Sequence, residues 1–180
     1  MVYGQAPNRW LAASSGVRDL VPEGARIVEL ASGEGRNAVW LAEQGFRTVG
    51  VDISAAGVAK SRAFAKAKGM SEDVLWFETG DATTFGDDDS FDAVVGIFAH
   101  VPPPMKQAFI ANMVRIVKPG GRVIGQWYTP THVDRKNDPA IAWGKGGPPD
   151  AAACESTART CHRPQRAWPC RRAGHLRHWP

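Results

Sequence analysis

The 180-residue chain has no run of about 18 apolar residues, so the sequence predicts no membrane-spanning helix. Its first residues contain neither a basic start nor an apolar stretch after it, from which we expect no export signal and a cytosolic protein. The body of the chain has no cysteine, because Cys154, Cys161 and Cys170 all lie after residue 150. Without an expected secretory context, these three cysteines do not predict a disulfide framework.

The segment from residue 151 onward lacks Ile, Val, Phe, Met, Tyr and Lys and contains a single leucine, Leu176. Its apolar residues follow neither a period of 2 nor a period of 3.6. We therefore expect residues 150–180 to be an irregular or disordered tail that builds no core element. Because Arg, Pro, Ala, His and Trp are what a GC-rich gene yields in a wrong reading frame, we also hypothesise that this tail is translated out of frame.

The net charge of +4 is unevenly distributed. Residues 1–150 carry 16 Lys and Arg against 17 Asp and Glu, whereas residues 151–180 carry 6 Arg against one Glu. Basicity is thus a property of the tail, and no aromatic-basic pattern accompanies it, so we expect no specific nucleic-acid binding. The Cys and His residues of the tail lack the paired spacing of zinc ligands, and we expect no metal site.

Residues 1–149 have the composition and length of one domain with a hydrophobic core. Apolar runs, turn residues and helical periodicity alternate along them. We expect strands at 26–31, 46–51, 74–79, 91–98 and 122–127, and helices at 8–20, 36–44, 54–69 and 104–117. Such alternation predicts an α/β fold, Rossmann-like and doubly wound, with a mostly parallel sheet of five strands.

The stretch from Ile27 to Asp52 is predicted to be half of a nucleotide-binding unit. It reads as a buried strand, a tight turn at Gly33 and Gly35, a helix, and a second strand that ends in an acid. A carboxylate at the end of that second strand is placed to bind the two hydroxyls of a ribose. Because a bare G-x-G pattern is weak evidence, a nicotinamide dinucleotide remains a rival ligand.

Three further features bear on the ligand. Glu29 lies four residues before Gly33, where a carboxylate would bond the glycine loop or orient a cationic ligand, or would simply end a strand. Asp81 follows the third strand, where it would accept a hydrogen bond from an adenine amino group or serve as a turn residue. The sequence Lys118-Pro-Gly-Gly121 leads into the fifth strand.

Together these residues resemble the class I S-adenosylmethionine-dependent methyltransferases. In that family the glycine loop follows an acid, a ribose-binding acid ends the second strand, an acid follows the third, and KPGG precedes the fifth. The resemblance covers roughly residues 3–149 and looks most like the small tellurite-resistance and thiopurine-methylating enzymes. It implies S-adenosylmethionine as cofactor and methyl transfer to a small-molecule acceptor. The cofactor-binding residues that it implies are Glu29, Ala31, Gly33, Gly35, Asn37, Asp52, Ile53, Asp81, Ala82 and Phe98.

The acceptor would be contacted by Tyr3, His100 and Tyr128, from the N-terminal segment and the loops after the fourth and fifth strands. For His100 the roles of general base and of solvated loop residue both stay open. For the two tyrosines, a packing role is favoured over contact with the acceptor. The sequence identifies no catalytic residue.

The sequence departs from the family pattern at two places. Ala31 occupies the position of the first loop glycine, and the residues after Trp127 show none of the helix and antiparallel hairpin with which the family ends. We therefore expect that hairpin to be missing and the fifth strand to be an exposed edge. A non-catalytic or truncated nucleoside-binding remnant is the alternative function. An NAD-binding oxidoreductase is a further alternative, which Glu29 disfavours.

Overall fold

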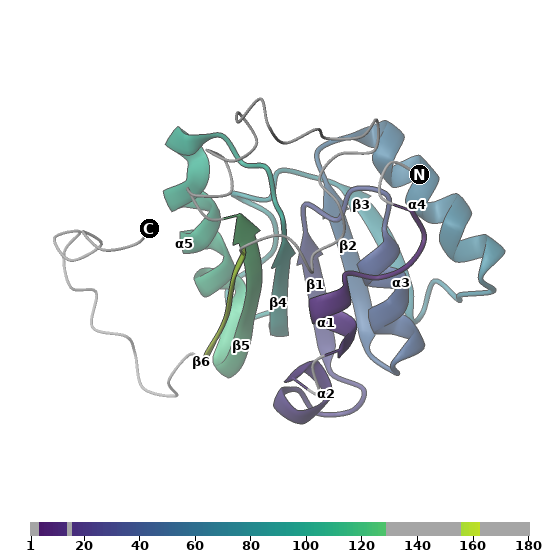
Figure 1. Ribbon diagram of the computed structural model, residues 1–180, viewed down its shortest axis with the longest axis horizontal. Coiled ribbons are helices and arrows are strands. Elements are labelled where there is room, and N and C mark those ends of the chain that lie inside the picture. The colour runs from purple at the N-terminus through teal and green to yellow at the C-terminus, as the bar shows by residue number, and fades with distance from the viewer. Residues whose placement is uncertain (1–3, 14–15, 129–155, 163–180) are drawn as a thin grey trace, which may run out of the picture.

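A computed structural model describes residues 4–13, 16–128 and 156–162, which form a six-stranded sheet with helices on both faces (Figure 1). The strand order is β3-β2-β1-β4-β5-β6. The strands are β1 (Arg26–Leu30), β2 (Arg47–Asp52), β3 (Leu75–Thr79), β4 (Phe91–Ile97), β5 (Val117–Tyr128) and β6 (Ser156–His162). The helices are α1 (Arg9–Ala13), α2 (Gly16–Leu20), α3 (Arg36–Glu43), α4 (Ala55–Ala67), the 3₁₀ turn η1 (Pro103–Met105) and α5 (Lys106–Ile116).

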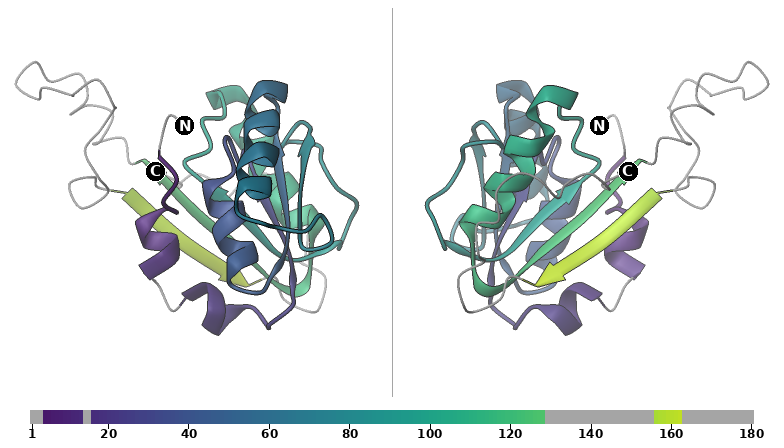
Figure 2. Two further views of the ribbon diagram at one scale, coloured as in Figure 1. Left: turned by 90° about the vertical axis from the view of Figure 1, so that its right-hand side faces the viewer. Right: turned by 90° about the vertical axis from the view of Figure 1, so that its left-hand side faces the viewer.

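The first five strands are all parallel to one another, which confirms the predicted α/β, doubly wound, Rossmann-like sheet. Their apolar runs are continuous because helices cover both faces of the sheet. Ile27 and Val95 point to one face and pack with residues of α1, α2 and α3. Val28 and Val94 point to the other face and pack against α5. The side views in Figure 2 show α5 on the opposite side of β5 from α1 and α2.

The helix ends follow local chemistry. Ser54 caps α4, since its Oγ accepts a hydrogen bond from the Gly57 backbone N–H at 3.1 Å. Gly45 and Gly69 follow α3 and α4 with φ values of 92° and 70°, the left-handed conformation that ends helices. The single helix expected at 8–20 is instead two short helices, α1 and α2, separated by residues 14–15, which lie outside the described residues.

The fifth strand begins earlier in the chain than predicted. Residues 118–121 were expected to separate the two elements, but β5 already begins at Val117, directly after α5. The register between β4 and β5 shifts, because Phe91 pairs with Val117 whereas Ala93 pairs with Arg122. Residues 118–121, which include Gly120 and Gly121, therefore form an irregularity within β5. At Gly121, a Cβ would lie 2.7 Å from the Asp92 carbonyl oxygen, which explains the need for glycine there.

The expectation of an exposed fifth strand was wrong. β6 pairs antiparallel with β5 along seven positions, from Arg122 with His162 to Tyr128 with Ser156. The tail therefore contributes one regular element, although the rest of 150–180 lies outside the described residues. Apolar periodicity does not reveal such a strand, because backbone hydrogen bonds to an open sheet edge are available to almost any sequence. The division into a domain at 1–149 and a tail at 150–180 stays a prediction.

Candidate functional site

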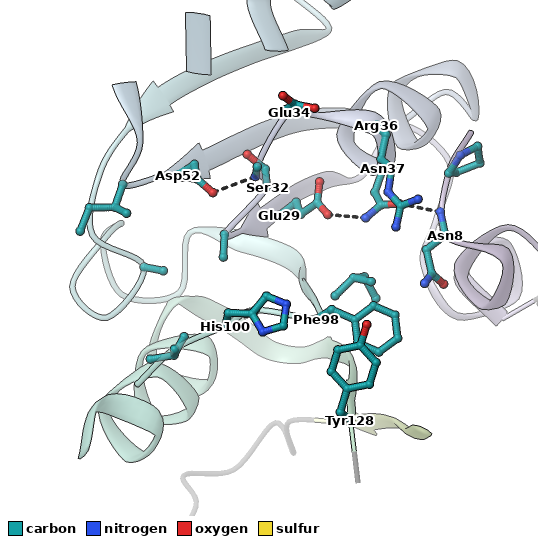
Figure 3. A pocket seen from close by; sticks show the side chains of 18 of the residues that line it. Asn8, Glu29, Ser32, Glu34, Arg36, Asn37, Asp52, Phe98, His100 and Tyr128 are labelled. Atoms are coloured by element: carbon teal, nitrogen blue, oxygen red, sulfur yellow. Dashed lines mark hydrogen bonds between the residues drawn. The ribbon is translucent and has the colours of Figure 1, made fainter. Parts of the chain in front are cut away.

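A cavity of about 890 Å³ opens at the carboxyl ends of the parallel strands, the usual ligand position in doubly wound sheets (Figure 3). Two walls face each other across it. The polar wall comes from the N-terminal segment and the loops after β1, β2 and β3, and contains Gly4, Ala6, Pro7, Asn8, Arg9, Glu29, Ala31, Ser32, Gly33, Glu34, Arg36, Asn37, Asp52, Ile53, Asp81, Ala82 and Thr83. The aromatic wall comes from the ends of β4 and β5 and contains Ile97, Phe98, Ala99, His100, Val101, Pro102, Met105 and Tyr128.

Asp52 holds the glycine loop in place. Its Oδ2 accepts a hydrogen bond from the Gly33 backbone N–H at 2.8 Å, and its Oδ1 accepts one from the Ser54 N–H at 2.9 Å. A carboxylate has about four acceptor positions, so both oxygens keep capacity for further donors. The residue therefore orders the loop and still offers acceptors to the cavity.

Helix α4 braces the same loop from behind. The Ser61 hydroxyl, fully buried, donates a hydrogen bond to the Gly33 carbonyl oxygen at 3.0 Å. Gly57 allows this approach, because a Cβ there would lie 3.1 Å from that carbonyl oxygen. The sequence offered one signal for this contact, a glycine near the start of an otherwise good helix.

Glu29 begins a buried polar chain behind the polar wall. Its side chain is 1% exposed, and its Oε1 accepts a hydrogen bond from Asn37 Nδ2 at 2.8 Å. The Asn37 Oδ1 in turn accepts from the Asn8 backbone N–H at 2.7 Å, which ties the N-terminal segment to the site. Burial raises the pKa of Glu29 to about 7, although the bond from Asn37 and the charge of Arg36 act in the opposite direction. A hydrogen bond from the Ala38 backbone also acts to lower this pKa. Among the described residues no donor lies in good hydrogen-bonding geometry to Oε2, and the residue lines the cavity.

Asp81 shapes the loop after β3. Its Oδ1 accepts two hydrogen bonds from Thr83, one from the backbone N–H and one from the hydroxyl, each at 2.8 Å. These bonds hold the pKa of Asp81 below its ordinary value. Helix α5 fixes the loop from the outside, since Asn112 Nδ2 donates to the Ala82 carbonyl oxygen at 2.9 Å and Arg115 Nη2 donates to that of Gly86 at 2.7 Å. The loop thus occupies the place where a helix would otherwise connect β3 to β4.

The aromatic wall is built on one strained residue. Phe98 has a φ of 49°, the left-handed conformation that is rare for a bulky side chain. Its backbone N–H donates to the Gln126 carbonyl oxygen at 2.8 Å, and its ring stacks on that of Tyr128 at 4.4 Å between centroids. The His100 ring lies 6.0 Å from the Tyr128 ring and is tilted from it by 25°. Strain of this kind is typical of functional sites, where the surrounding structure imposes it.

Nearly all the residues expected to form the site line this cavity. Gly35 does not, because it is buried behind the loop, where a Cβ would lie 2.8 Å from the Phe77 ring. Tyr3 lies outside the described residues. Reasoning from the sequence missed Arg36, whose Nη1 donates to the Ala6 carbonyl oxygen at 3.3 Å. The position of Arg36 directly after the glycine loop could have indicated from the sequence that it belongs to the site. The predicted residues that line the cavity are Glu29, Ala31, Gly33, Asn37, Asp52, Ile53, Asp81, Ala82, Phe98, His100 and Tyr128.

Within the described part of the chain, no three His, Cys, Asp or Glu side chains gather as a metal site would require. No helix in that part is long and apolar enough to cross a membrane.

Comparison with known proteins supports the reading of the cavity. A family described as "Methyltransferase domain" matches residues 27–121, more than half of the chain. A demethylmenaquinone methyltransferase of Beutenbergia cavernae is 35% identical over 111 residues, which cover 59% of this chain and 42% of that protein. A 2-heptyl-1-hydroxyquinolin-4(1H)-one methyltransferase of Mycobacteroides abscessus is 25% identical over 101 residues, covering 54% and 44%. The chain therefore spans less than half the length of these two relatives.

Solved structures share the fold. The magnesium protoporphyrin IX methyltransferase of Synechocystis PCC 6803, solved with bound S-adenosylmethionine, aligns with a TM-score of 0.56 at 22% identity, covering 67% of this chain and 55% of that one. The residues of the cavity fit such a cofactor, because the carboxyl groups of Glu29, Asp52 and Asp81 lie along one wall and can accept hydrogen bonds. With the fold, the cavity and the family match in agreement, the chain belongs to the family described as "Methyltransferase domain".

Proposed function

We propose that this protein binds S-adenosylmethionine along the polar wall and transfers its methyl group to a small molecule held against the aromatic wall. The observation that carries the proposal is the set of acceptor side chains on the polar wall, where Glu29, Asp52 and Asp81 line one cavity at the carboxyl ends of the strands. Glu29 is the buried carboxyl group of this set, and the ammonium group of the cofactor's methionine end would donate to it. Arg36, on the same wall, would face the carboxylate of that end.

The remaining polar residues extend this assignment along the wall. Asp52 would accept hydrogen bonds from the ribose hydroxyls, and the exposed Ile53 side chain would pack on the adenine ring. Asp81 has both of its bonds from Thr83 on Oδ1, so Oδ2 would accept from the adenine amino group. Ala31, Gly33, Asn37, Ala82 and Phe98 would complete the cofactor site. Gly35 would act from behind the loop by letting Phe77 pack closely.

In such a reaction the protein would align the methyl donor with the acceptor and enclose both away from water. When bound, S-adenosylmethionine supplies a methyl group already activated by a sulfonium, so little acid or base chemistry is demanded of the protein. The polar wall would fix the donor, while the aromatic wall would hold the acceptor in line with it and exclude water. Bringing the two reactants together in this geometry accounts for most of the rate enhancement that we expect.

Replacing Asp52 tests the cofactor assignment. Because Asp52→Ala removes charge-assisted hydrogen bonds of about 1.5–3 kcal/mol each, we expect the affinity for S-adenosylmethionine to fall at least tenfold by calorimetry. Asp73→Ala, which removes an exposed acid outside the cavity, should bind as the unmodified chain does. Thermal melts of both variants show whether the loop still folds. Absence of cofactor binding by the folded, unmodified chain would refute the proposal.

Two other functions remain as competing outcomes. A non-catalytic or truncated nucleoside-binding remnant would bind S-adenosylmethionine or adenosine and transfer no methyl group to any acceptor. An NAD-binding oxidoreductase would bind NAD more tightly than S-adenosylmethionine in the same calorimeter. The relatives named above are called methyltransferases of a demethylmenaquinone and of a hydroxyquinolinone, which supports a small-molecule acceptor.

Several finer expectations from the sequence stay predictions. They are the likeness to the tellurite-resistance and thiopurine enzymes, the cytosolic location, and the out-of-frame origin of residues 151–180. The last of these is settled by sequencing the source DNA. A one-base shift near codon 150 should restore a sequence with strand and helix periodicity.

A further inference from the structure

The two walls of the cavity differ in charge. Every Asp, Glu, Lys or Arg that lines the cavity within the described residues belongs to the polar wall, namely Arg9, Glu29, Glu34, Arg36, Asp52 and Asp81. The aromatic wall contains none. Apart from His100, the aromatic wall offers no side chain that could pair with a charged acceptor, so it favours an uncharged molecule.

The rings of the aromatic wall favour a flat molecule. Phe98 and Tyr128 are stacked within 18° of parallel, and both are only half-buried, so part of their surface faces the cavity. The left-handed φ of Phe98 costs about 1–3 kcal/mol, and in this conformation the ring stacks on Tyr128. Aromatic rings gain from offset stacking on other rings beyond what burial of apolar area provides. Figure 3 shows both rings and His100 across the cavity from Glu29 and Asp52.

The cavity is large for a ligand pocket. Ligand pockets usually measure about 300–1,000 Å³, and this one, at about 890 Å³, lies near the upper end. A cofactor bound along the polar wall would leave the space before the aromatic wall for an acceptor.

We propose that the acceptor is an uncharged, planar aromatic molecule, stacked on the Phe98 and Tyr128 rings. This inference rests on the proposed function. With an acceptor that reacts through a hydroxyl group, the hydroxyl oxygen forms a bond to the methyl carbon as the carbon–sulfur bond of the sulfonium breaks, and S-adenosylhomocysteine leaves. The hydroxyl proton passes to the imidazole of His100, the one basic side chain of the described part of the aromatic wall, and then to water.

Three probe compounds separate the features of this acceptor class. The full chain, saturated with S-adenosylhomocysteine, is titrated with 2-naphthol, cyclohexanol and benzoate while binding is followed by NMR. We expect saturable binding of 2-naphthol, at least tenfold weaker binding of the non-planar cyclohexanol, and no binding of the charged benzoate. Equal or tighter binding of either control compound would overturn the proposal.

A pair of variants tests the stacking role of Tyr128. Tyr128→Phe keeps the ring and should bind 2-naphthol as before, whereas Tyr128→Ala removes it and should weaken binding about tenfold. Both variants should keep their affinity for S-adenosylhomocysteine, which shows that the fold and the polar wall are intact. Failure to bind S-adenosylhomocysteine would refute the proposed function itself. Intact binding with no preference for 2-naphthol, or no difference between the two variants, would refute the acceptor class alone.

Discussion

The polar wall and the aromatic wall are held together by different kinds of contact. Hydrogen bonds interlock the polar wall: Asp52 fixes the Gly33 amide, Ser61 fixes the Gly33 carbonyl, and Asn37 links Glu29 to the N-terminal segment. The aromatic wall depends on ring stacking, at Phe98 and Tyr128, and on one strained backbone conformation. A site that binds a constant cofactor on one side and a particular acceptor on the other would show this division. Changes to the polar wall should affect folding and cofactor binding together, whereas changes to His100 or Tyr128 on the aromatic wall should affect the acceptor alone.

The largest change in the free energy of unfolding is expected for Gly35→Ala, a substitution behind the polar wall. The added Cβ would lie 2.8 Å from the Phe77 ring and 2.9 Å from the Ser61 Cβ, at a residue with a φ of 82°. Overpacking of about 1–3 kcal/mol and a left-handed backbone cost of about 1–2 kcal/mol together predict a loss of about 3 kcal/mol in the free energy of unfolding. Urea denaturation measures the loss.

Gly45→Ala is the matched control for that substitution. Gly45 also has a positive φ, of 92°, but nothing lies within 4 Å of an added Cβ. Only the backbone cost of about 1–2 kcal/mol should remain. If both variants lost the same stability, the close packing of Phe77 against the glycine loop would not be what requires glycine at residue 35.

The second prediction concerns the contribution of Glu29, on the polar wall, to the pH dependence of the free energy of unfolding. In the folded protein the pKa of Glu29 is about 7, against an ordinary value of 4.5, so between these pH values the folded state binds more protons than the unfolded state. Stability from this group is therefore greatest below pH 4.5 and is lost as the pH rises to about 7. Glu29→Gln cannot ionise and should not show this loss.

Denaturation at pH 5 and pH 8 tests the effect of Glu29. Relative to the unmodified chain, Glu29→Gln should gain about 2–3 kcal/mol of stability between the two pH values, since one pKa unit is about 1.4 kcal/mol. Other carboxylates with shifted pKa values, such as Asp81 and Asp92, cancel in this comparison. The variant should also bind S-adenosylmethionine more weakly. A pH profile parallel to that of the unmodified chain would mean that Glu29 does not titrate in this range.

The sequence predicted the polar wall far better than the aromatic wall, for a physical reason. The glycine loop, Glu29 and Asp52 lie within one strand-turn-helix-strand unit, where a local pattern of residues sets the geometry. Phe98 and Tyr128, which stack on each other, lie 30 positions apart in the sequence, at the ends of β4 and β5. No local sequence pattern predicts the left-handed φ of Phe98. Both residues were named as site residues, but only the resemblance to a known family indicated them.

The parallel core of the sheet was predictable because each buried strand is an apolar run between turn residues. The sixth strand was not, since an edge strand is stabilised by backbone pairing with β5 and needs no apolar pattern. The bracing of the loop after β3 by Asn112 and Arg115 was equally hidden, because side chains on a distant helix donate to backbone carbonyl groups that any residue presents.

The smallest change in stability is expected for Ala31→Gly. This substitution tests whether alanine at residue 31 strains the backbone of the polar wall. Ala31 lines the cavity with a φ of 58°, a conformation that costs an L-residue about 1–2 kcal/mol and costs glycine nothing. Glycine loses about 0.5–1 kcal/mol more conformational entropy on folding, so a net gain of about 0.5–1 kcal/mol in stability should remain. Ala38→Gly, within α3, should instead destabilise the chain, because there glycine relieves no strain. If Ala31→Gly also lost stability, the methyl group of Ala31 would be contributing packing to the polar wall that outweighs the strain of its backbone.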